Sequence, residues 1–548
     1  MRVYLKEIKE KFLEFEIENY DENIYFENIN HDSRVYIADS LFIPIIGKNF
    51  DGHDFIESSK CRVSLMQRDH KERYKLDIPL IIVEDILEGL KEIIGYVRDK
   101  VNVPVIGITG STGKTTTRMM TVSILSQFGK VLTSDKNINT LWGNSELLMT
   151  FSDEKYVVLE IGMDSKGEIK MQCEGLKPNI GGILNVGYVH GENVGGIEGV
   201  FNEKRQLADY LVSNNKPVVL NTDDKRLKKL ADELKTNIVT IGGSNQDYTF
   251  SNVHLDENGT HFLLKYNGKS FDCNLKVLGK NYVYNALCAI AFCNTLGVSI
   301  EDCIKGVEKY NGFKERFEIK KINSHLTIIN DAYNANPASM KMSLDTFNEL
   351  WGRRKDIKKI LVLGDMKELG SVASQEHKKI ADIVNSMDVD CIIYFGEYSK
   401  YFKGLRDTHH RDTHLREPVC DTEGIFAADR DQRIDTEPSD VVQQPLHVLL
   451  VFEGVRPRRP EDRSPFREDP RHRVVGERFD VPDDQTAPSV PYPDRVKTMS
   501  CSGSHDRPDH RVQARTVPSA RQYAYRRHLI TFPLCRSSSP HPHSHRRG

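Results

Sequence analysis

A glycine-rich segment near residue 110 carries the residues best suited to chemistry in this chain. It is Gly107-Ile-Thr-Gly-Ser-Thr-Gly-Lys-Thr-Thr-Thr117, and it follows the apolar run Val101 to Ile106, which predicts a buried strand. The residues from Arg118 to Phe128 have the apolar spacing of a helix. A strand, a glycine loop and a helix start form a phosphate-binding loop, in which backbone N–H groups and the positive helix end face a polyphosphate. In such a loop Lys114 reaches the outer phosphates and the Thr115 hydroxyl binds Mg²⁺.

Polar side chains follow the strands that are predicted further along the chain. Glu160 ends the apolar run Tyr156 to Ile161, where a buried carboxylate needs a partner and Mg²⁺ would supply one. His190 follows the next strand, and together with Glu160 it is a candidate metal ligand. The loop at residues 330–337 gathers hydrogen-bonding groups that suit ribose, phosphate or substrate. Lys204 lies on a helical segment, a position that is by itself typical of a surface lysine.

Length and composition limit the possible classes of protein. A chain of 548 residues predicts three or four domains, and 39% hydrophobic with 28% charged residues is typical of a soluble protein. The net charge of −3 gives no reason to expect a nucleic-acid or membrane partner. The first ten residues are too charged for a signal peptide, and no apolar run is long enough to span a bilayer. The ten scattered cysteines, with no Cys-x-x-Cys pair, predict reduced thiols in the cytoplasm.

The hydrophobic pattern predicts an α/β protein. Residues 1–98 form a small α/β domain, in which Val35 to Ala38 is strand-like. Residues 99–315 alternate strands and helices, which indicates a central, doubly wound, mostly parallel sheet covered on both faces. Tyr248 to Leu275 is predicted to be an antiparallel insertion in this domain. A third α/β domain, incomplete and Rossmann-like, covers residues 316–405. Ligands of such sheets bind at the carboxyl ends of the strands.

The composition changes abruptly near residue 405. Residues 406–548 contain no Asn and a single Lys, Lys497, and are rich in Arg, His and Pro. We expect a tail of low order, because it buries too little apolar surface to offset chain entropy; only Val441 to Phe452 resembles a strand or short helix. One interpretation is a genuine basic, His-rich interaction tail. The change from a composition rich in Lys and Asn to one rich in Arg and Pro favours a second interpretation, a frameshift or a fusion to unrelated coding sequence.

Together these motifs resemble the Mur ligase family of peptidoglycan synthesis, over residues from about 30 to 404. The resemblance implies a three-domain architecture around a central phosphate-loop ATPase domain, with ATP and Mg²⁺ as cofactors. The motifs that carry it are Asp32-Ser-Arg34, Asp51-Gly-His53, the loop from Gly110 to Thr117, Glu160-Ile-Gly162, Gly167-Glu-Ile169, Asn285-Ala-Leu287, Asp331-Ala-Tyr-Asn-Ala-Asn336 and Gly364-Asp-Met-Lys-Glu-Leu-Gly370.

The resemblance also implies a role for each matching residue. Lys204 falls where the family carries a carbamylated lysine, and with Lys114 and His190 it forms the expected catalytic set. The expected ATP-binding residues are Gly110, Ser111, Thr112, Gly113, Lys114, Thr115, Thr116, Asn285, Arg316 and Asp331. The expected metal ligands are Thr115, Glu160 and His190. The expected substrate-binding residues are Ser33, Arg34, Asp51, Asn137, Asn139, Asn334 and Asn336.

The motifs from Asp331 to Asn336 and from Gly364 to Gly370 are typical of the family member that joins D-alanyl-D-alanine to UDP-N-acetylmuramoyl-tripeptide. The implied reaction is ATP-dependent amide formation through an acyl phosphate. The implied enzyme is a cytoplasmic monomer that takes these two small molecules as its substrates and needs no nucleic acid and no membrane insertion.

Two departures from the family keep other functions open. Asn281-Tyr282 stands where the family usually has His-Asn, and the Lys-Gly-Ser-Arg-like element that follows in the third domain is missing after Leu405. One alternative is therefore a nucleotide-binding homologue that no longer ligates. Another is a similar ligase with a different amine acceptor.

Overall fold

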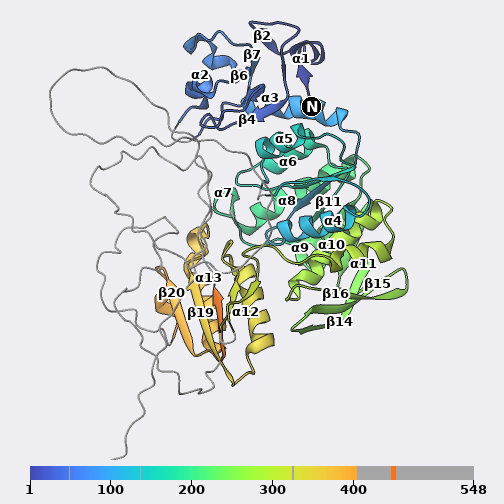
Figure 1. The fold of residues 1–548 in the computed structure, drawn as a ribbon, viewed down its shortest axis with the longest axis vertical. Coiled ribbons are helices and arrows are strands. Elements are labelled where there is room, and N and C mark those ends of the chain that lie inside the picture. Colours follow the sequence, from blue (N-terminus) through green and yellow to red (C-terminus); the bar gives the residue numbers. More distant parts are fainter. Residues whose placement is uncertain (48–49, 136–137, 190, 324–325, 404–445, 452–548) are drawn as a thin grey trace, which may run out of the picture. The chain divides into compact units, whose positions relative to one another are not determined.

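The computed structural model describes residues 1–403 and the backbone of residues 446–451, apart from residues 48–49, 136–137, 190 and 324–325 (Figure 1). The described chain is an α/β protein, as predicted, and its three larger sheets contain five, nine and five strands in chain order. Within this described part, every helix is too short or too polar to cross a membrane.

The first sheet has the strand order β2-β7-β6-β5-β4. Strand β2 is antiparallel to β7, and the other neighbours are parallel. Asp85 caps the start of helix α3, where its carboxylate accepts hydrogen bonds from the N–H groups of Leu87 and Glu88. The elements are β1 (Val3–Tyr4), α1 (Leu5–Lys11), β2 (Glu16–Glu18), β3 (Tyr25–Phe26), β4 (Asn28–Asn30), β5 (Ser40–Phe42), η1 (Gly52–Phe55), α2 (Ile56–Ser59), β6 (Val63–Gln67), η2 (Arg68–Arg73), β7 (Leu80–Val83) and α3 (Ile86–Lys100).

The strand predicted at Val35 to Ala38 is wrong, because this segment belongs to a turn. The Val35 N–H donates to the Asp32 carbonyl at 3.0 Å, and the Asn30 side chain donates to the Val35 carbonyl at 2.8 Å. Val35 and Tyr36 are left 50% and 66% exposed. Local hydrogen bonds therefore override the β propensity of these residues.

The middle sheet has nine strands in the order β16-β15-β14-β13-β12-β11-β8-β10-β9. Strands β8 to β14 are parallel, whereas β14, β15 and β16 are antiparallel, which confirms the predicted insertion at Tyr248 to Leu275. The elements are β8 (Val105–Thr109), α4 (Lys114–Leu125), β9 (Val131–Leu132), α5 (Leu141–Met149), β10 (Tyr156–Glu160), α6 (Glu168–Leu176), β11 (Ile180–Ile183), α7 (Gly191–Val194), α8 (Gly196–Ser213), β12 (Val218–Asn221), α9 (Lys225–Leu234), β13 (Ile238–Gly242), β14 (Tyr248–Asp256), β15 (Gly259–Tyr266), β16 (Lys269–Leu275), α10 (Asn281–Thr295) and α11 (Ile300–Glu308).

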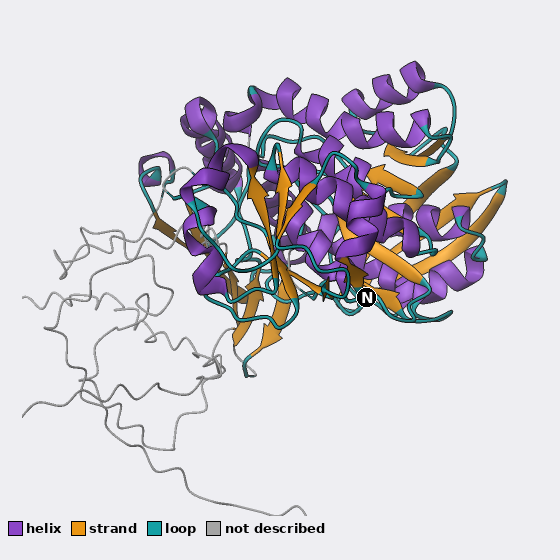
Figure 2. Ribbon diagram, turned by 90° about the horizontal axis from the view of Figure 1, so that it is seen from above, coloured by secondary structure: helices purple, strands orange, loops and turns teal. Residues whose placement is uncertain are grey.

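Helices cover both faces of this middle sheet (Figure 2). One apolar core packs α4, α10 and α11 against the sheet, and α10 is buried along almost its whole length. A second core packs α6, α8 and α9 against the other face. Parallel strands buried on both faces explain the continuous apolar runs that the sequence shows.

The strand before the glycine loop lies four residues later than predicted. Val101 caps the end of α3, where its N–H donates to the carbonyls of Val97 and Arg98. Strand β8 begins only at Val105, after Pro104, which cannot donate to a sheet. The β-branched run at 101–106 thus ends a helix and starts a strand, so its composition alone misplaced the boundary.

The third sheet has the order β17-β18-β21-β19-β20, with β17 antiparallel and the other strands parallel. Its core lies between the strands and the helices α12 and α13. The elements are β17 (Glu318–Lys321), β18 (Leu326–Asn330), α12 (Pro337–Trp351), β19 (Ile357–Gly364), η3 (Gly370–Val372), α13 (Ala373–Ser386), β20 (Cys391–Phe395), η4 (Ser399–Tyr401) and β21 (Leu446–Val451).

Strand β21 comes from the segment that the composition assigns to the tail. It lies in the middle of the third sheet, where Leu449 pairs with Ile328 of β18 and with Ile360 of β19. The segment Val441 to Phe452 was the one part of the tail that resembled a strand. That the third domain ends at residue 405 stays a prediction. However, the central strand of its sheet, β21, lies after residue 405 in the sequence.

A proline at Leu449 tests whether β21 completes this sheet. Each N–H of a strand between two others bonds to one neighbour, and proline has no N–H to donate. We expect Leu449→Pro to make amide hydrogen exchange in β18 and β19 roughly tenfold faster or more. The control is Gln443→Pro, which lies outside β21 and should leave those rates unchanged. Unchanged exchange in Leu449→Pro would contradict a structural role for β21.

Candidate active site

The glycine loop joins β8 to α4 and has the shape that a phosphate needs. Gly113 has a φ of 84°, and a Cβ there would lie 2.5 Å from the Asn285 side-chain oxygen, so only glycine fits. The Lys114 ammonium donates to the Gly110 carbonyl at 2.8 Å, folding back over the loop. Its burial lowers the pKa of Lys114, and the charge of Arg316 lowers it further, against the opposing effect of Glu160.

The end of β11 holds this loop in place. The Asn185 side chain accepts from the Thr112 N–H at 2.9 Å and donates to the Thr112 carbonyl at 3.1 Å. The Ser111 hydroxyl and the N–H and carbonyl of Gly187 form a second reciprocal pair at 2.8 Å. Asn185 is not in the predicted site set; the feature that could have identified it is a polar side chain just after the apolar strand β11.

Glu160 ends β10 and forms a buried ion pair with Arg118 of α4. The Arg118 Nε donates to Glu160 Oε1 at 2.9 Å, and both side chains are at most 1% exposed. Arg118 also donates to the Thr133 hydroxyl at 2.9 Å and to the Ser134 carbonyl. Glu160 Oε2 is buried and has no hydrogen-bond partner among the described residues, so it fits a cation such as Mg²⁺. Arg118 is not in the predicted site set. The feature that could have identified it is a charged residue on the predicted helix, one turn after Lys114.

Lys204 is buried on α8, contrary to what its sequence position alone suggests. Burial lowers its pKa well below the ordinary value, and the nearby charge of Lys114 acts in the same direction. This shift favours the neutral amine, the form that reacts with CO₂ to give a carbamate. His190, predicted as catalytic and as a metal ligand, lies outside the described residues, as does Asn137.

The third domain contributes Asp331 and Arg316. Asp331 accepts from the Phe317 N–H at 3.0 Å and from the Ser343 hydroxyl at 2.5 Å, and burial raises its pKa to about 6. The Arg316 guanidinium lies 3.9 Å from the centre of the Tyr333 ring. Tyr333 was not in the predicted set either, although it lies within the motif from Asp331 to Asn336.

A cavity of about 450 Å³ gathers most of the predicted nucleotide site. The predicted residues that line it are Ser111, Thr112, Gly113, Lys114, Thr115, Thr116, Asn139, Asn285, Arg316, Asp331, Asn334 and Asn336. Residues from loops on two sheets thus face one space, at the carboxyl ends of β8 and β18. Gly110, Glu160 and Lys204 do not line this cavity, and neither do Ser33, Arg34 and Asp51. The role of each residue stays a prediction.

The N-terminal substrate motif contacts helix α5. Arg34 pairs with Asp32 at 2.6 Å. The adjacent His31 pairs with Glu146 of α5 at 2.5 Å, and its ring lies 6.3 Å from that of Trp142. Helix α5 follows directly after Asn139, which lines the cavity. This link between the two predicted substrate regions was not foreseen, because nothing in the sequence pairs His31 with Glu146.

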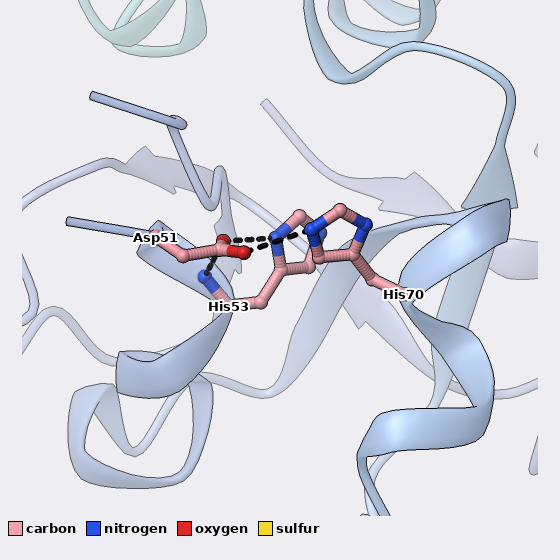
Figure 3. Close-up of side chains that lie close together, drawn as sticks. All are labelled: Asp51, His53 and His70. Carbon is pink, nitrogen blue, oxygen red and sulfur yellow. Dashed lines mark hydrogen bonds and ion pairs between the residues drawn. The ribbon is translucent and has the colours of Figure 1, made fainter. Parts of the chain in front are cut away.

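Asp51 is held in a hydrogen-bonded group with His53 and His70 (Figure 3). Its two oxygens lie 2.6 Å from His53 Nδ1 and 2.8 Å from His70 Nε2. Within the described chain, these are the residues whose metal-binding atoms cluster within 4.8 Å. However, His53 Nε2 accepts the Gln67 N–H at 3.1 Å, so Nδ1 carries the proton and donates to Asp51. The group therefore fixes its loop by hydrogen bonds and is not suited to a metal.

Removing Arg118 tests whether it neutralises Glu160. We expect Arg118→Met to lower the free energy of unfolding by about 3–5 kcal/mol, because it leaves a buried, unpaired carboxylate. In the double variant Arg118→Met/Glu160→Gln the charge is gone, so most of this loss should be recovered. Urea unfolding of both variants measures the effect. Equal losses in the single and double variants would show that the lost packing, and not the charge, dominates.

The raised pKa of Asp331 predicts a pH-dependent stability. The folded state binds this proton more tightly than the unfolded state, whose carboxyl has a pKa of 3.8. The contribution of Asp331 to stability is therefore present below pH 4 and is lost as the pH rises through about 6. Relative to the wild type, Asp331→Asn should gain roughly 3 kcal/mol between pH 4 and pH 7.5. Urea unfolding at both values checks this, with the exposed Asp345→Asn as the control; a difference that does not change with pH would contradict it.

Known proteins resemble this chain in sequence and in fold. The family model "Mur ligase middle domain" matches residues 108–293, and "Mur ligase, glutamate ligase domain" matches residues 315–450. The chain is 30% identical to the UDP-N-acetylmuramoyl-tripeptide–D-alanyl-D-alanine ligase of Bacillus subtilis, over 78% of this chain and 95% of the relative. The same ligase of Escherichia coli is 28% identical, over 69% of this chain and 83% of the relative.

Solved structures give the same assignment. MurF from Acinetobacter baumannii superposes with a TM-score of 0.69 at 25% identity, covering 83% of this chain and 96% of that one. MurF from Thermotoga maritima, solved in complex with ADP, has the same fold, with a TM-score of 0.64 at 22% identity over 78% and 93% of the two chains. The chain therefore belongs to the Mur ligase family of ATP-dependent ligases.

Proposed function

We propose that this protein adds D-alanyl-D-alanine to UDP-N-acetylmuramoyl-tripeptide in peptidoglycan synthesis. The observation that carries the proposal is the cavity in which the phosphate loop and Lys114 face Arg316 and Asp331 of the third domain. The named activity of the Bacillus subtilis relative, aligned over 95% of its length, supports these two substrates. The motif from Asp331 to Asn336 supports the same family member.

The reaction first brings two anions together. A carboxylate oxygen of the tripeptide substrate attacks the terminal phosphorus of ATP, and ADP leaves with the bonding electrons. Lys114 and Arg316 lower the barrier by offsetting the charge that gathers between the two reactants. The unprotonated amine of D-alanyl-D-alanine then attacks the acyl carbon of the acyl phosphate. Phosphate leaves and an amide forms; the nitrogen gives up one of its two protons and keeps the other as the amide N–H.

We propose that Thr115, Glu160 and His190 hold Mg²⁺ when it is bound. Glu160 Oε2, which has no hydrogen-bond partner in the described part of the chain, supports the role of Glu160. The role of Thr115 is supported by its place on the cavity wall. The bound ion would supply positive charge to the phosphate oxygens. Lys204 would act as a carbamate, which its burial and the lowered pKa of its amine support.

We further propose that Ser33 and Arg34 receive the uridine nucleotide, with Asp51 and Asn137 as further substrate contacts. Asn139, Asn334 and Asn336 line the cavity, which supports a role in substrate binding. Six cysteines in the described part of the chain are buried free thiols, which supports a reducing compartment, the cytoplasm: Cys61, Cys173, Cys273, Cys288, Cys293 and Cys303. We expect a monomer that needs neither nucleic acid nor membrane insertion.

The deciding experiment measures ADP release by the full 548-residue chain with ATP, Mg²⁺ and UDP-N-acetylmuramoyl-tripeptide, with and without D-alanyl-D-alanine. We expect release that needs both substrates. Lys114→Ala and Lys204→Arg should each reduce kcat by about 10²-fold or more, because each removes charge stabilisation at the site. Lys130→Ala, at an exposed lysine paired with Asp153, is the matched control and should match the wild type.

The other outcomes separate the alternatives. ATP binding without substrate-dependent ADP release would indicate a homologue that no longer ligates. Release that appears only with another amine would indicate a different acceptor. Full activity in Lys114→Ala would contradict the phosphate-loop assignment itself.

A further inference from the structure

Tyr282 connects helix α10 to the backbone of Arg316. It is the second residue of α10, it is 4% exposed, and it lies on the cavity wall. Its hydroxyl donates to the backbone carbonyl of Arg316 at 2.9 Å. Burial raises the pKa of Tyr282 well above its ordinary value, so the hydroxyl keeps its proton and remains a donor.

The backbone on both sides of Arg316 is strained. Glu315 has a φ of 61° and Phe317 a φ of 50°, so two non-glycine residues are left-handed within three positions. Such a backbone conformation is unfavourable for a residue with a side chain and persists only where its surroundings hold it. Two bonds come from the third domain, since Tyr333 N–H donates to the Glu315 carbonyl at 3.3 Å and Asp331 accepts from Phe317. The bond from Tyr282 comes from the middle domain.

The Arg316 side chain is placed for an anion. Its guanidinium is stacked on Tyr333, and its Nε is buried without a hydrogen-bond partner in the described part of the chain. Arg316 also lies close enough to lower the pKa of Lys114. Two cations that repel each other across one cavity are both stabilised when a polyphosphate lies between them.

We propose that Tyr282 is a positioning residue that ties Arg316 to the nucleotide-binding helix α10. Its hydroxyl fixes the strained peptide of Arg316, so the guanidinium stays where it meets the terminal phosphate of ATP. This inference rests on the proposed function.

The test compares the affinity of Tyr282→Phe for ATP and for ADP by titration calorimetry on the full chain. Phenylalanine keeps the ring and removes only the hydrogen bond. We expect ATP to bind about 5–10-fold more weakly, and ADP, which lacks the terminal phosphate, less than about twofold more weakly. A purely structural role would weaken both nucleotides equally.

Two further variants make the test specific. Tyr248→Phe removes another buried hydroxyl of the middle domain, one that donates to Asn294 at 2.6 Å. Neither residue lines the cavity, so this variant should leave the ATP-to-ADP affinity ratio unchanged. In an Arg316→Met background, Tyr282→Phe should have almost no additional effect, because the two residues act through one interaction.

The possible failures are distinguishable. Equal weakening of both nucleotides, no weakening, or a full additional effect in Arg316→Met would overturn the role of Tyr282 while leaving the ligase assignment intact. A wild-type chain that binds neither nucleotide would contradict the proposed function, and the role of Tyr282 with it.

Discussion

The buried ion pair between Arg118 and Glu160 is the constraint on which the rest of the site depends. A carboxylate at the end of a fully buried strand cannot stay charged without a partner. Helix α4 supplies that partner one turn after Lys114, on the same face of the helix, since residues four apart lie above one another. The same helix therefore follows the phosphate loop directly and neutralises Glu160. Because Arg118 satisfies only one oxygen, the other remains available for a cation.

The two sides of the cavity differ in how rigidly they are held. On the middle-domain side, Asn185 and Gly187 bind the glycine loop by hydrogen bonds just after β11. These bonds fix the N–H groups of the loop before a ligand binds. On the other side, Arg316 lies on a strained backbone whose hydrogen bonds come from two domains. Lys114 and Arg316 repel each other across the cavity, so a polyanion bound between them would stabilise both.

Much of this arrangement could be predicted from the sequence, for identifiable reasons. The residues from Ser111 to Thr116 follow a buried strand, and Asp331 directly follows a short apolar strand. All of them line the cavity, while their roles in binding stay predictions. The contacts of Arg118 with Glu160 and of Tyr282 with Arg316 span 42 and 34 residues, and no local pattern pairs them. The prediction of a strand at Val35 to Ala38 was wrong because of local contacts: short-range hydrogen bonds outweighed the β propensity of these residues.

The segment after residue 405 shows how far composition can mislead. Its Arg, Pro and His content argues against a packed core, and that argument treats the segment as uniform. Yet six residues, Leu446–Val451, form an unbroken run rich in Leu and Val, and the third sheet has room for one parallel strand between β18 and β19. A central strand needs only such a run and a connection long enough to reach it. The family match through residue 450 supports assigning this strand to the third domain. A change of composition along a chain therefore need not coincide with the end of a folded domain.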